Sequence, residues 1–305
     1  MKTDHKGKFG GQYDSSANIN FFHILKWKLF KNKKFSLRPR PMTPLTLKQD
    51  LEKLTQEGDF LCWLSHASFL IQLGGKRILI DPVFGNIPFY KRLIKAPYEV
   101  EDLGKIDYLL ISHTHYDHFD KASIRALDIM QPNAVIPLRM SPLIQKIAPR
   151  ISSRELDWYE SYEDRDLTIT LVPSRHWGRR GLFDKNRVLW GGYILTYRDK
   201  SIYFSGDSAS GAHFEEIGQR YDIDIALLPI GAYKPEFIMK ENHLNPQEAF
   251  DAFRQLKSKK MIPMHYGTFD LADEHLDEPL KWIQKIAENH PGEILFLKPG
   301  EVLSC

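Results

Sequence analysis

The chain has 305 residues, of which 42% are hydrophobic and 27% are charged, so it can bury a large core and is not intrinsically disordered. Its two cysteines, Cys62 and Cys305, exclude a disulfide framework and a thiolate metal site, which favours a reducing compartment. The sequence shows neither a secretory signal at its start nor an apolar run of the roughly 18 residues that span a bilayer, so we expect a cytoplasmic protein, either soluble or peripheral at the membrane surface.

The positive charge is concentrated at the beginning of the chain. Residues 1–41 hold ten Lys and Arg against Asp4 and Asp14, so this part carries +8 and the remainder −5. Lysines alternate with aromatic and aliphatic residues over 21–34, a mixture suited to an anionic membrane surface. The alternative is an arm that packs by its aromatic residues while its lysines are solvated. We predict residues 1–46 to be a basic aromatic extension packing on the body, whose acidic charge disfavours nucleic-acid binding.

Residues 47–305 alternate between strand and helix patterns and are predicted to form one α/β domain. Apolar runs bounded by turn residues predict strands at 61–64, 68–73, 77–80, 108–111, 134–136, 167–172, 188–197, 202–204, 225–228 and 261–264. Helical patterns lie at 47–56, 121–130, 142–147, 214–220, 246–257 and 278–290. Strand pairs joined by tight turns and interspersed with helices indicate two sheets back to back with helices outside.

The segment ISHTHYDHFD, residues 111–120, places three imidazoles and two carboxylates within eight positions, directly after an apolar strand. Alternate residues of an extended segment share a face, so His113 and His115 can bind one ion. Asp117 and His118, where the chain turns toward a helix, can reach another. Imidazole and carboxylate ligands without thiolates suit zinc, manganese or iron.

Three later strands each end shortly before a residue that can bind a metal. His176 follows the strand at 167–172, Asp207 follows the one at 202–204, and His265 directly follows the one at 261–264. Separately, these residues could lie in a surface loop, cap a helix or fill the core. Together with HTHYDH, they predict a metal site built from rigid strand ends. The remaining histidines outside this pattern are assigned no metal-binding role: His5, His23, His66, His213, His275 and His290.

Longer motifs resemble the metallo-β-lactamase superfamily and, within it, the N-acyl-phosphatidylethanolamine-hydrolysing phospholipase D family. The resemblance covers nearly the whole chain and includes WLSHASFLIQL, ILIDPVF, LLISHTHYDHFD, IYFSGDSA, LLPIGAYKP and MHYGTFDLADEH. The metal motif is specific for the superfamily, whereas PIGAY, the HW at the third histidine and HYGTF are specific for this branch. The resemblance implies a four-layer αββα sandwich of two mixed β-sheets flanked by helices.

The resemblance also implies two metal ions, zinc in the first place, with manganese or iron as alternatives. It assigns His113, His115 and His176 to one ion, Asp117, His118 and His265 to the second, and Asp207 to a bridge between them. Asp81 and Asp120 resemble carboxylates that orient metal ligands, although a turn residue and a helix cap are equally compatible. His243 resembles the additional catalytic histidine of the family, the alternative being a cap or a packing residue. Asp117, Asp207 and His243 are thus the expected catalytic residues.

Two cations about 3.5 to 4 Å apart would share a water and present hydroxide to phosphorus, with Asp207 orienting it. The resemblance implies a phospholipase D-type phosphodiesterase that cleaves N-acyl-phosphatidylethanolamine-like lipids. Trp177, Tyr193, Tyr233 and Tyr266 are candidates for the pocket wall, with ordinary core positions as the alternative.

Two other functions stay open at this point. Metal ligands do not select a substrate, so a lactonase or a phosphodiesterase for a small soluble metabolite is one alternative. A non-hydrolytic metal-binding or redox protein is the other, and the lack of a flavin or dinucleotide fingerprint disfavours it. A homodimer is compatible with the sequence, which does not fix the oligomeric state.

Overall fold

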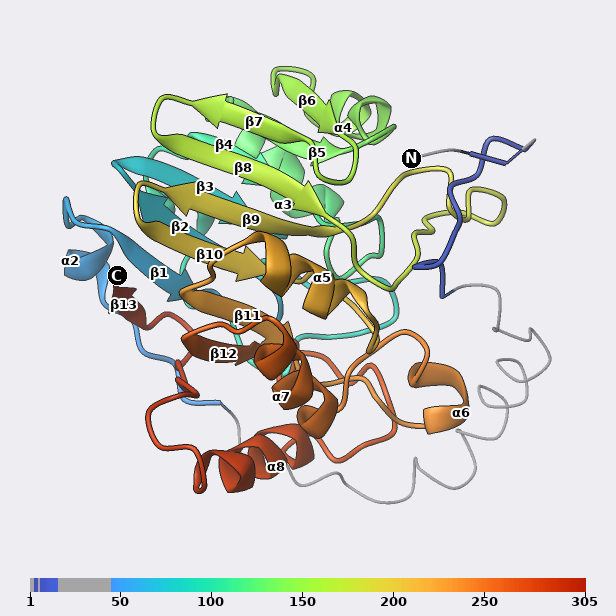
Figure 1. The fold of residues 1–305 in the computed structure, drawn as a ribbon. Coiled ribbons are helices and arrows are strands. Elements are labelled where there is room, and N and C mark those ends of the chain that lie inside the picture. The colour runs from blue at the N-terminus through green and yellow to red at the C-terminus, as the bar shows by residue number, and fades with distance from the viewer. Residues whose placement is uncertain (1–2, 5, 16–44) are drawn as a thin grey trace.

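The computed structural model describes residues 3–4, 6–15 and 45–305 (Figure 1). The segment 21–34, for which we predict membrane contact, lies outside the described residues. The division into an extension at 1–46 and a domain at 47–305 therefore stays a prediction.

Two mixed β-sheets pack face to face with helices outside them, which confirms the predicted α/β sandwich (Figure 1). The first sheet has the strand order β13 (Val302–Ser304), β1 (Phe60–Trp63), β2 (Phe69–Leu73), β3 (Lys76–Ile80), β4 (Tyr108–Leu110), β5 (Asn133–Pro137) and β6 (Ser153–Leu156). The second has the order β12 (Lys260–Met264), β11 (Ile225–Pro229), β10 (Lys200–Phe204), β9 (Gly192–Tyr197), β8 (Leu167–Val172) and β7 (Ser161–Asp164). Both sheets combine parallel and antiparallel pairs.

Helices connect the strands along the chain. They are α2 (Leu51–Leu54), η2 (Val100–Leu103), α3 (Lys121–Ala126), η3 (Leu127–Ile129), α4 (Ser141–Ile147), α5 (His213–Arg220), α6 (Glu236–Met239), α7 (Pro246–Gln255) and α8 (Glu278–Ala287). The start of α7 is fixed by a capping box, in which Asn245 and Glu248 satisfy each other's backbone N–H groups. None of the helices in the described ranges combines the length and apolar character needed to cross a membrane.

The core lies between the sheets, and a second apolar cluster lies under α3 and α4. Strand β4 contributes side chains to both clusters, because successive side chains of a strand point to opposite faces. Tyr108 and Leu110 face the other sheet, while Leu109 packs into the cluster that contains Ile124 and Ile144. All five side chains are buried. Strands buried on both faces explain why their sequences read as continuous apolar runs.

Several predicted elements are shorter than expected, and two begin four residues later than predicted. The helix predicted at 47–56 covers only Leu51–Leu54, and the strand predicted at 188–197 begins at Gly192. Leu189 and Gly191 instead donate backbone hydrogen bonds to Leu138 and Ser112 near the first sheet, so this stretch bridges the two layers before β9 begins.

The described N-terminal segment runs beside the chain that follows β8. Phe9 and Tyr13 are buried, with 3% and 7% of their surface exposed. His176 donates its backbone N–H to Tyr13 O at 3.1 Å, and Ser15 donates to His176 O at 3.2 Å. Residues 6–15 therefore contribute directly to the backbone around a predicted metal ligand.

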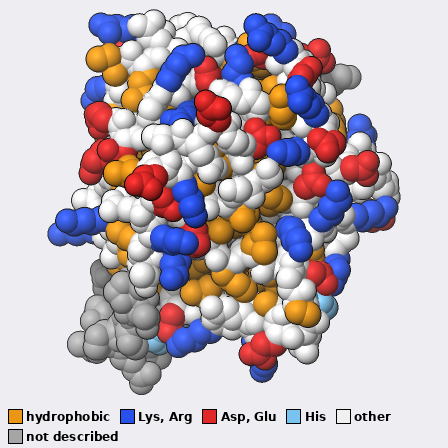
Figure 2. All heavy atoms as spheres, turned by 90° about the vertical axis from the view of Figure 1, so that its left-hand side faces the viewer, with side chains coloured by type: hydrophobic (Ala, Val, Ile, Leu, Met, Phe, Trp, Pro, Cys, Tyr) orange, Lys and Arg blue, Asp and Glu red, His pale blue; other side chains and the backbone are white. Residues whose placement is uncertain are grey.

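The face at the left of Figure 1 is turned toward the viewer in Figure 2, where apolar side chains gather among charged ones. A groove of the molecule is lined by Leu280 of α8, by Phe296 and Leu297 before β13, and by Leu45 and Tyr266. None of the predicted metal ligands lines this groove, although Tyr266 directly follows the predicted ligand His265.

Candidate metal centre

All predicted ligands follow the carboxyl ends of strands that point the same way. In the first sheet, β3 and β4 are parallel, and the ligand motif follows β4. In the second sheet, β10, β11 and β12 are parallel, and β8 has the same direction because both β8 and β10 are antiparallel to β9. These strands end toward the right of Figure 1. Polar residues at strand ends are thereby collected at one edge of the sandwich, on a rigid scaffold.

The first group of ligand atoms belongs to three histidines. His115 Nδ1 lies 2.9 Å from His113 Nε2 and 3.1 Å from His176 Nε2. Donor atoms on a tetrahedral zinc ion at about 2.1 Å stand about 3.4 Å apart, so this convergence fits a divalent cation. Burial lowers the pKa of His113 and His176 well below the usual value and that of His115 to about 4. Neutral imidazoles offer the lone pair that a metal needs.

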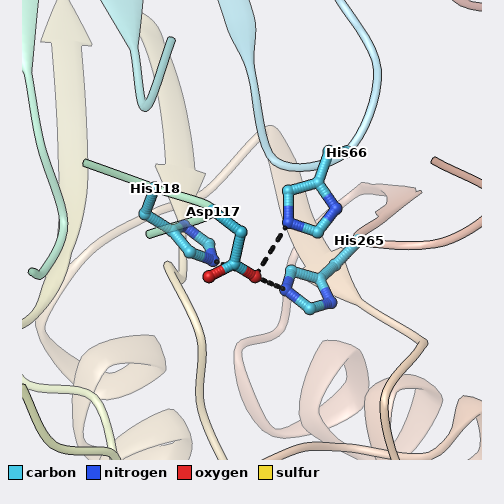
Figure 3. Close-up of side chains that lie close together, drawn as sticks. All are labelled: His66, Asp117, His118 and His265. Atoms are coloured by element: carbon cyan, nitrogen blue, oxygen red, sulfur yellow. Dashed lines mark hydrogen bonds and ion pairs between the residues drawn. The ribbon is translucent and has the colours of Figure 1, made fainter. Parts of the chain in front are cut away.

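The second group combines a carboxylate with two histidines. Asp117 Oδ2 lies 3.4 Å from His265 Nε2 and 3.7 Å from His118 Nε2. Figure 3 shows these side chains converging from separate segments of the chain. Burial acts to lower the pKa of His265, but the carboxylates of Asp207 and Asp117 outweigh it and raise the pKa to about 9. Two carboxylates therefore make this group strongly attractive to positive charge.

Asp207 faces both groups. Its Oδ2 lies 4.0 Å from the Nε2 atoms of His113 and His176, and 3.2 Å from that of His118. Its Oδ1 lies 3.2 Å from Nε2 of His265. The preceding Gly206 has φ of +59°, and a Cβ there would stand 2.9 Å from a backbone oxygen, so glycine is required where the chain turns to present Asp207.

Several polar atoms at this centre are buried without a hydrogen-bond partner. They include the Nε2 atoms of His118 and His265, Oδ1 of Asp207 and Nδ1 of His243. Each such atom costs about 1 to 3 kcal/mol when left unpaired. The three imidazole nitrogens all lie within 3.7 Å of an Asp207 carboxylate oxygen, an arrangement that fits a cation as the missing partner, and imidazole and carboxylate donors suit zinc, manganese or iron.

Asp81 and Asp120 behave differently from each other. The buried Asp81 carboxylate accepts from Ser112 N at 2.7 Å and lies 2.7 Å from His118 Nδ1, so it turns His118 Nε2 toward the centre. Asp120 accepts from Ser123 N at 2.9 Å and caps α3, the alternative that its sequence position left open.

His243 lies beside the ligand groups. Its Nδ1 is 3.7 Å from Asp207 Oδ2, and its ring centroid is 5.4 Å from that of His176. Burial lowers the pKa of His243 to about 4, so the imidazole is neutral. Its backbone N–H donates to Met239 O of α6, which fixes the segment at the edge of the centre.

The four aromatic residues considered for the pocket wall fall into two classes. The Trp177 ring lies edge-on to His115 at 4.6 Å, and Tyr266 lines a small cavity with His265. Tyr193 is fully buried between the sheets and donates to Ile111 O at 2.8 Å, so it occupies the alternative core position. Tyr233 is also buried, and its hydroxyl donates to Glu278 at 2.9 Å.

One residue of this cluster, His66, was assigned no role by the sequence pattern. It lies in the turn after β1, and its Nε2 is 3.1 Å from Asp117 Oδ2 (Figure 3). His66 precedes the ligand motif by 47 positions or more, which is why the motif did not include it. His66 could have been identified by the same pattern as the predicted ligands, because it too is a histidine shortly after an apolar strand.

Comparisons with known proteins agree with this geometry. The family model of the beta-lactamase superfamily domain matches residues 76–266, a range that contains all seven predicted metal ligands. N-acyl-phosphatidylethanolamine-hydrolyzing phospholipase D 1 of Caenorhabditis elegans is 32% identical over 253 residues, which cover 77% of this chain and 71% of the worm protein. A metal-dependent hydrolase of Pyrobaculum aerophilum is 28% identical over 244 residues, 79% of this chain and 97% of that protein. The solved structure of a metallo hydrolase from Ignicoccus hospitalis shares the fold, with a TM-score of 0.64 and 22% identity over 81% of this chain and 98% of that one.

Proposed function

Because this chain belongs to the beta-lactamase superfamily and is a metal-dependent hydrolase, we propose that it is a phospholipase D-type phosphodiesterase with two zinc ions. Its substrate would be an N-acyl-phosphatidylethanolamine-like lipid, and its products phosphatidic acid and an N-acylethanolamine. The observation that carries the proposal is the convergence of both predicted ligand groups on the Asp207 carboxylate, with Nδ1 of His243 3.7 Å from the same carboxylate. The similarity to the worm phospholipase D supports the choice of substrate.

Two divalent cations bound here would lower the pKa of a water molecule and bind the oxygens of a phosphodiester. The Asp207 carboxylate faces both ligand groups and can hold the nucleophilic water in line with phosphorus. Attack forms a bond from the water oxygen to phosphorus and breaks the bond between phosphorus and the ethanolamine oxygen, which then takes up a proton. The neutral His243 imidazole can donate a hydrogen bond to the phosphate or to this leaving oxygen.

Exposed apolar side chains on the loops around the centre support a lipid substrate over a soluble one. Leu182 and Phe183 are 77% and 85% exposed. Their loop packs on the ligand motif through Arg180. The Arg180 guanidinium donates to Phe119 O at 2.5 Å, and the Arg180 backbone oxygen accepts from the Tyr116 hydroxyl at 2.8 Å.

Two further exposed phenylalanines belong to segments whose neighbouring residues contact the centre. Phe237, 66% exposed, belongs to α6, whose last turn holds the backbone of His243. Phe89 is 97% exposed and directly precedes Tyr90. Tyr90 packs against the apolar cluster that contains Phe269, and the Phe269 ring contacts His66. We call Phe89, Leu182, Phe183 and Phe237 the apolar rim. Side chains of this kind insert at the boundary between lipid headgroups and acyl chains.

Replacing Leu182 and Phe183 together by Asp is expected to lower turnover of a vesicle substrate about tenfold or more, because the rim loses interfacial apolar contact. Ile129→Asp is the matched control, since Ile129 is 74% exposed on η3 and is not part of the rim. Turnover should be measured on vesicles and on a monomeric short-chain analogue. An equal loss on both substrates would contradict a role in interfacial contact.

The basic segment 21–34 is the other proposed membrane contact. Deleting residues 1–34 would be a poor test, because residues 6–15 support the backbone of His176. Replacing the five lysines of 21–34 by Gln is expected to weaken binding to anionic vesicles by about 10²-fold or more while neutral vesicles bind as before. Sedimentation with vesicles of both compositions measures this, and unchanged binding to anionic vesicles would refute the segment's role.

Mass-spectrometric identification of products tests the proposed reaction. Zinc-loaded protein is incubated with vesicles of mixed phospholipids, with Asp117→Ala as control. Phosphatidic acid and N-acylethanolamine that appear with the wild-type protein alone would support the proposal. If the protein holds two metal ions and no lipid changes, the lipid substrate is refuted, and lactones and small soluble phosphodiesters are the next substrates to assay.

A further inference from the structure

The turn between β1 and β2 holds His66 in a defined conformation. Ser65 and His66 have φ of +88° and +53°, values that are uncommon for residues other than glycine. The His66 carbonyl accepts from Trp63 Nε1 at 2.9 Å and from His265 N at 2.9 Å, and its N–H donates to Thr268 Oγ1 at 3.0 Å. The turn is thus tied both to its own strand and to the loop that carries His265.

The imidazole of His66 points at the metal centre (Figure 3). It is 1% exposed, and its Nε2 lies 3.1 Å from Asp117 Oδ2. Its ring centroid is 4.1 Å from that of His265, and it is edge-on to Phe269 at 5.1 Å. Its ring also lies 5.5 Å from that of His118, so one polar contact and three ring contacts define its surroundings.

The polar contact fixes which group donates. A carboxylate that binds a cation is ionised and can only accept, so the proton of this hydrogen bond is on His66 Nε2. Nε2 of His66 lies close enough to Asp117, His118 and His265 to bind the same ion, but in this hydrogen bond it carries the proton and has no free lone pair for a metal. The Asp117 oxygen has two lone-pair directions and can accept from His66 on one side while it faces His118 and His265 on the other.

We propose that His66 is a positioning residue that holds the Asp117 carboxylate in place and thereby sets the affinity of the group Asp117, His118 and His265 for its cation. Outer partners of metal ligands typically change metal affinity 10- to 100-fold when they are removed. This inference rests on the proposed two-ion centre, but it does not depend on the lipid substrate. The competing explanation is that His66 only fills space between His265 and Phe269.

Metal titration of three variants separates the two explanations. His66→Phe keeps a ring in the stack and removes the N–H, whereas His66→Gln supplies an amide N–H at a comparable reach. Phe269→Leu, the matched control, removes a ring contact of His66 and leaves its hydrogen bond in place. Apo-protein is titrated with Zn²⁺ against a chromophoric chelator, and uptake of Co²⁺ is followed by its visible absorption.

We expect wild-type protein to bind two equivalents of Zn²⁺. His66→Phe should keep the first affinity, which also shows that it folds, and lose about 10- to 100-fold in the second. His66→Gln and Phe269→Leu should stay within a few-fold of the wild type. Unchanged second affinity in His66→Phe, or an equal loss in His66→Phe and His66→Gln, would overturn the inference. Wild-type protein that takes up only one ion would instead refute the two-ion centre itself. The lipid substrate is tested separately by product analysis, so the two proposals can fail independently.

Discussion

Asp207→Ala is expected to lower hydrolytic turnover by about 10³-fold or more and to abolish the binding of two metal ions. The Asp207 carboxylate is 2% exposed and lies within 4.0 Å of nitrogens from both ligand groups. Without it, two cations would lie close together among neutral imidazoles, with Asp117 as the single remaining carboxylate ligand. Their mutual repulsion would then be poorly compensated, because buried charges interact strongly.

Metal content per chain, measured by elemental analysis together with turnover, tests this expectation. Asp166→Ala is the control, since Asp166 is an exposed carboxylate paired with Arg198. Asp207→Asn keeps the shape and one oxygen, and it should bind less metal than the wild type because the negative charge is gone. An Asp207→Ala protein that holds two ions and turns over normally would contradict the bridging role.

His243→Ala is expected to lower turnover about 10²- to 10⁴-fold while both metal ions stay bound. His243 is adjacent to the centre, with Nδ1 3.7 Å from Asp207 Oδ2; it lies near enough to Asp207 and His265 to share an ion with them, but neither of the two predicted ligand groups needs it. Its loss should therefore remove a hydrogen bond to the reacting phosphate and leave the cation sites intact.

Turnover and metal content of His243→Ala are compared with those of His275→Ala, a histidine whose side chain is 55% exposed. Loss of metal in His243→Ala would make His243 a ligand, and unchanged turnover would exclude a catalytic role. Either result would refute the assignment, whereas His275→Ala should match the wild-type protein.

The layered fold could be predicted because the strands that form its centre are unusually apolar. Residues such as Leu109 and Leu227 are buried in strands covered on both faces, and a continuous apolar run is the result. Strands β6 and β7 were not predicted, since they lie at the edges of the sheets, have half-exposed polar sequences and depend on their neighbours for pairing.

The clustering of the predicted ligands could be anticipated, because each of them follows a strand and the fold aligns the directions of these strands. The partners of those ligands were harder to foresee. Asp81 contacts His118 across the parallel pair formed by β3 and β4, a pairing that the motif alone does not specify. His66 reaches Asp117 only because the β1–β2 turn adopts positive φ angles, which ordinary residue preferences do not predict.

Each ligand group draws side chains from both layers of the sandwich. His113 and His115 follow a strand of the first sheet and His176 one of the second, while Asp117 and His118 face Asp207 and His265 in the same way. A cation bound by either group would therefore connect the two sheets directly. An ion that binds only the native chain adds about 4 kcal/mol to the free energy of unfolding at a thousand times its dissociation constant. Removal of the metal by a chelator should accordingly weaken the packing of one sheet on the other. The cation that takes part in hydrolysis would then also raise the temperature at which the sandwich unfolds.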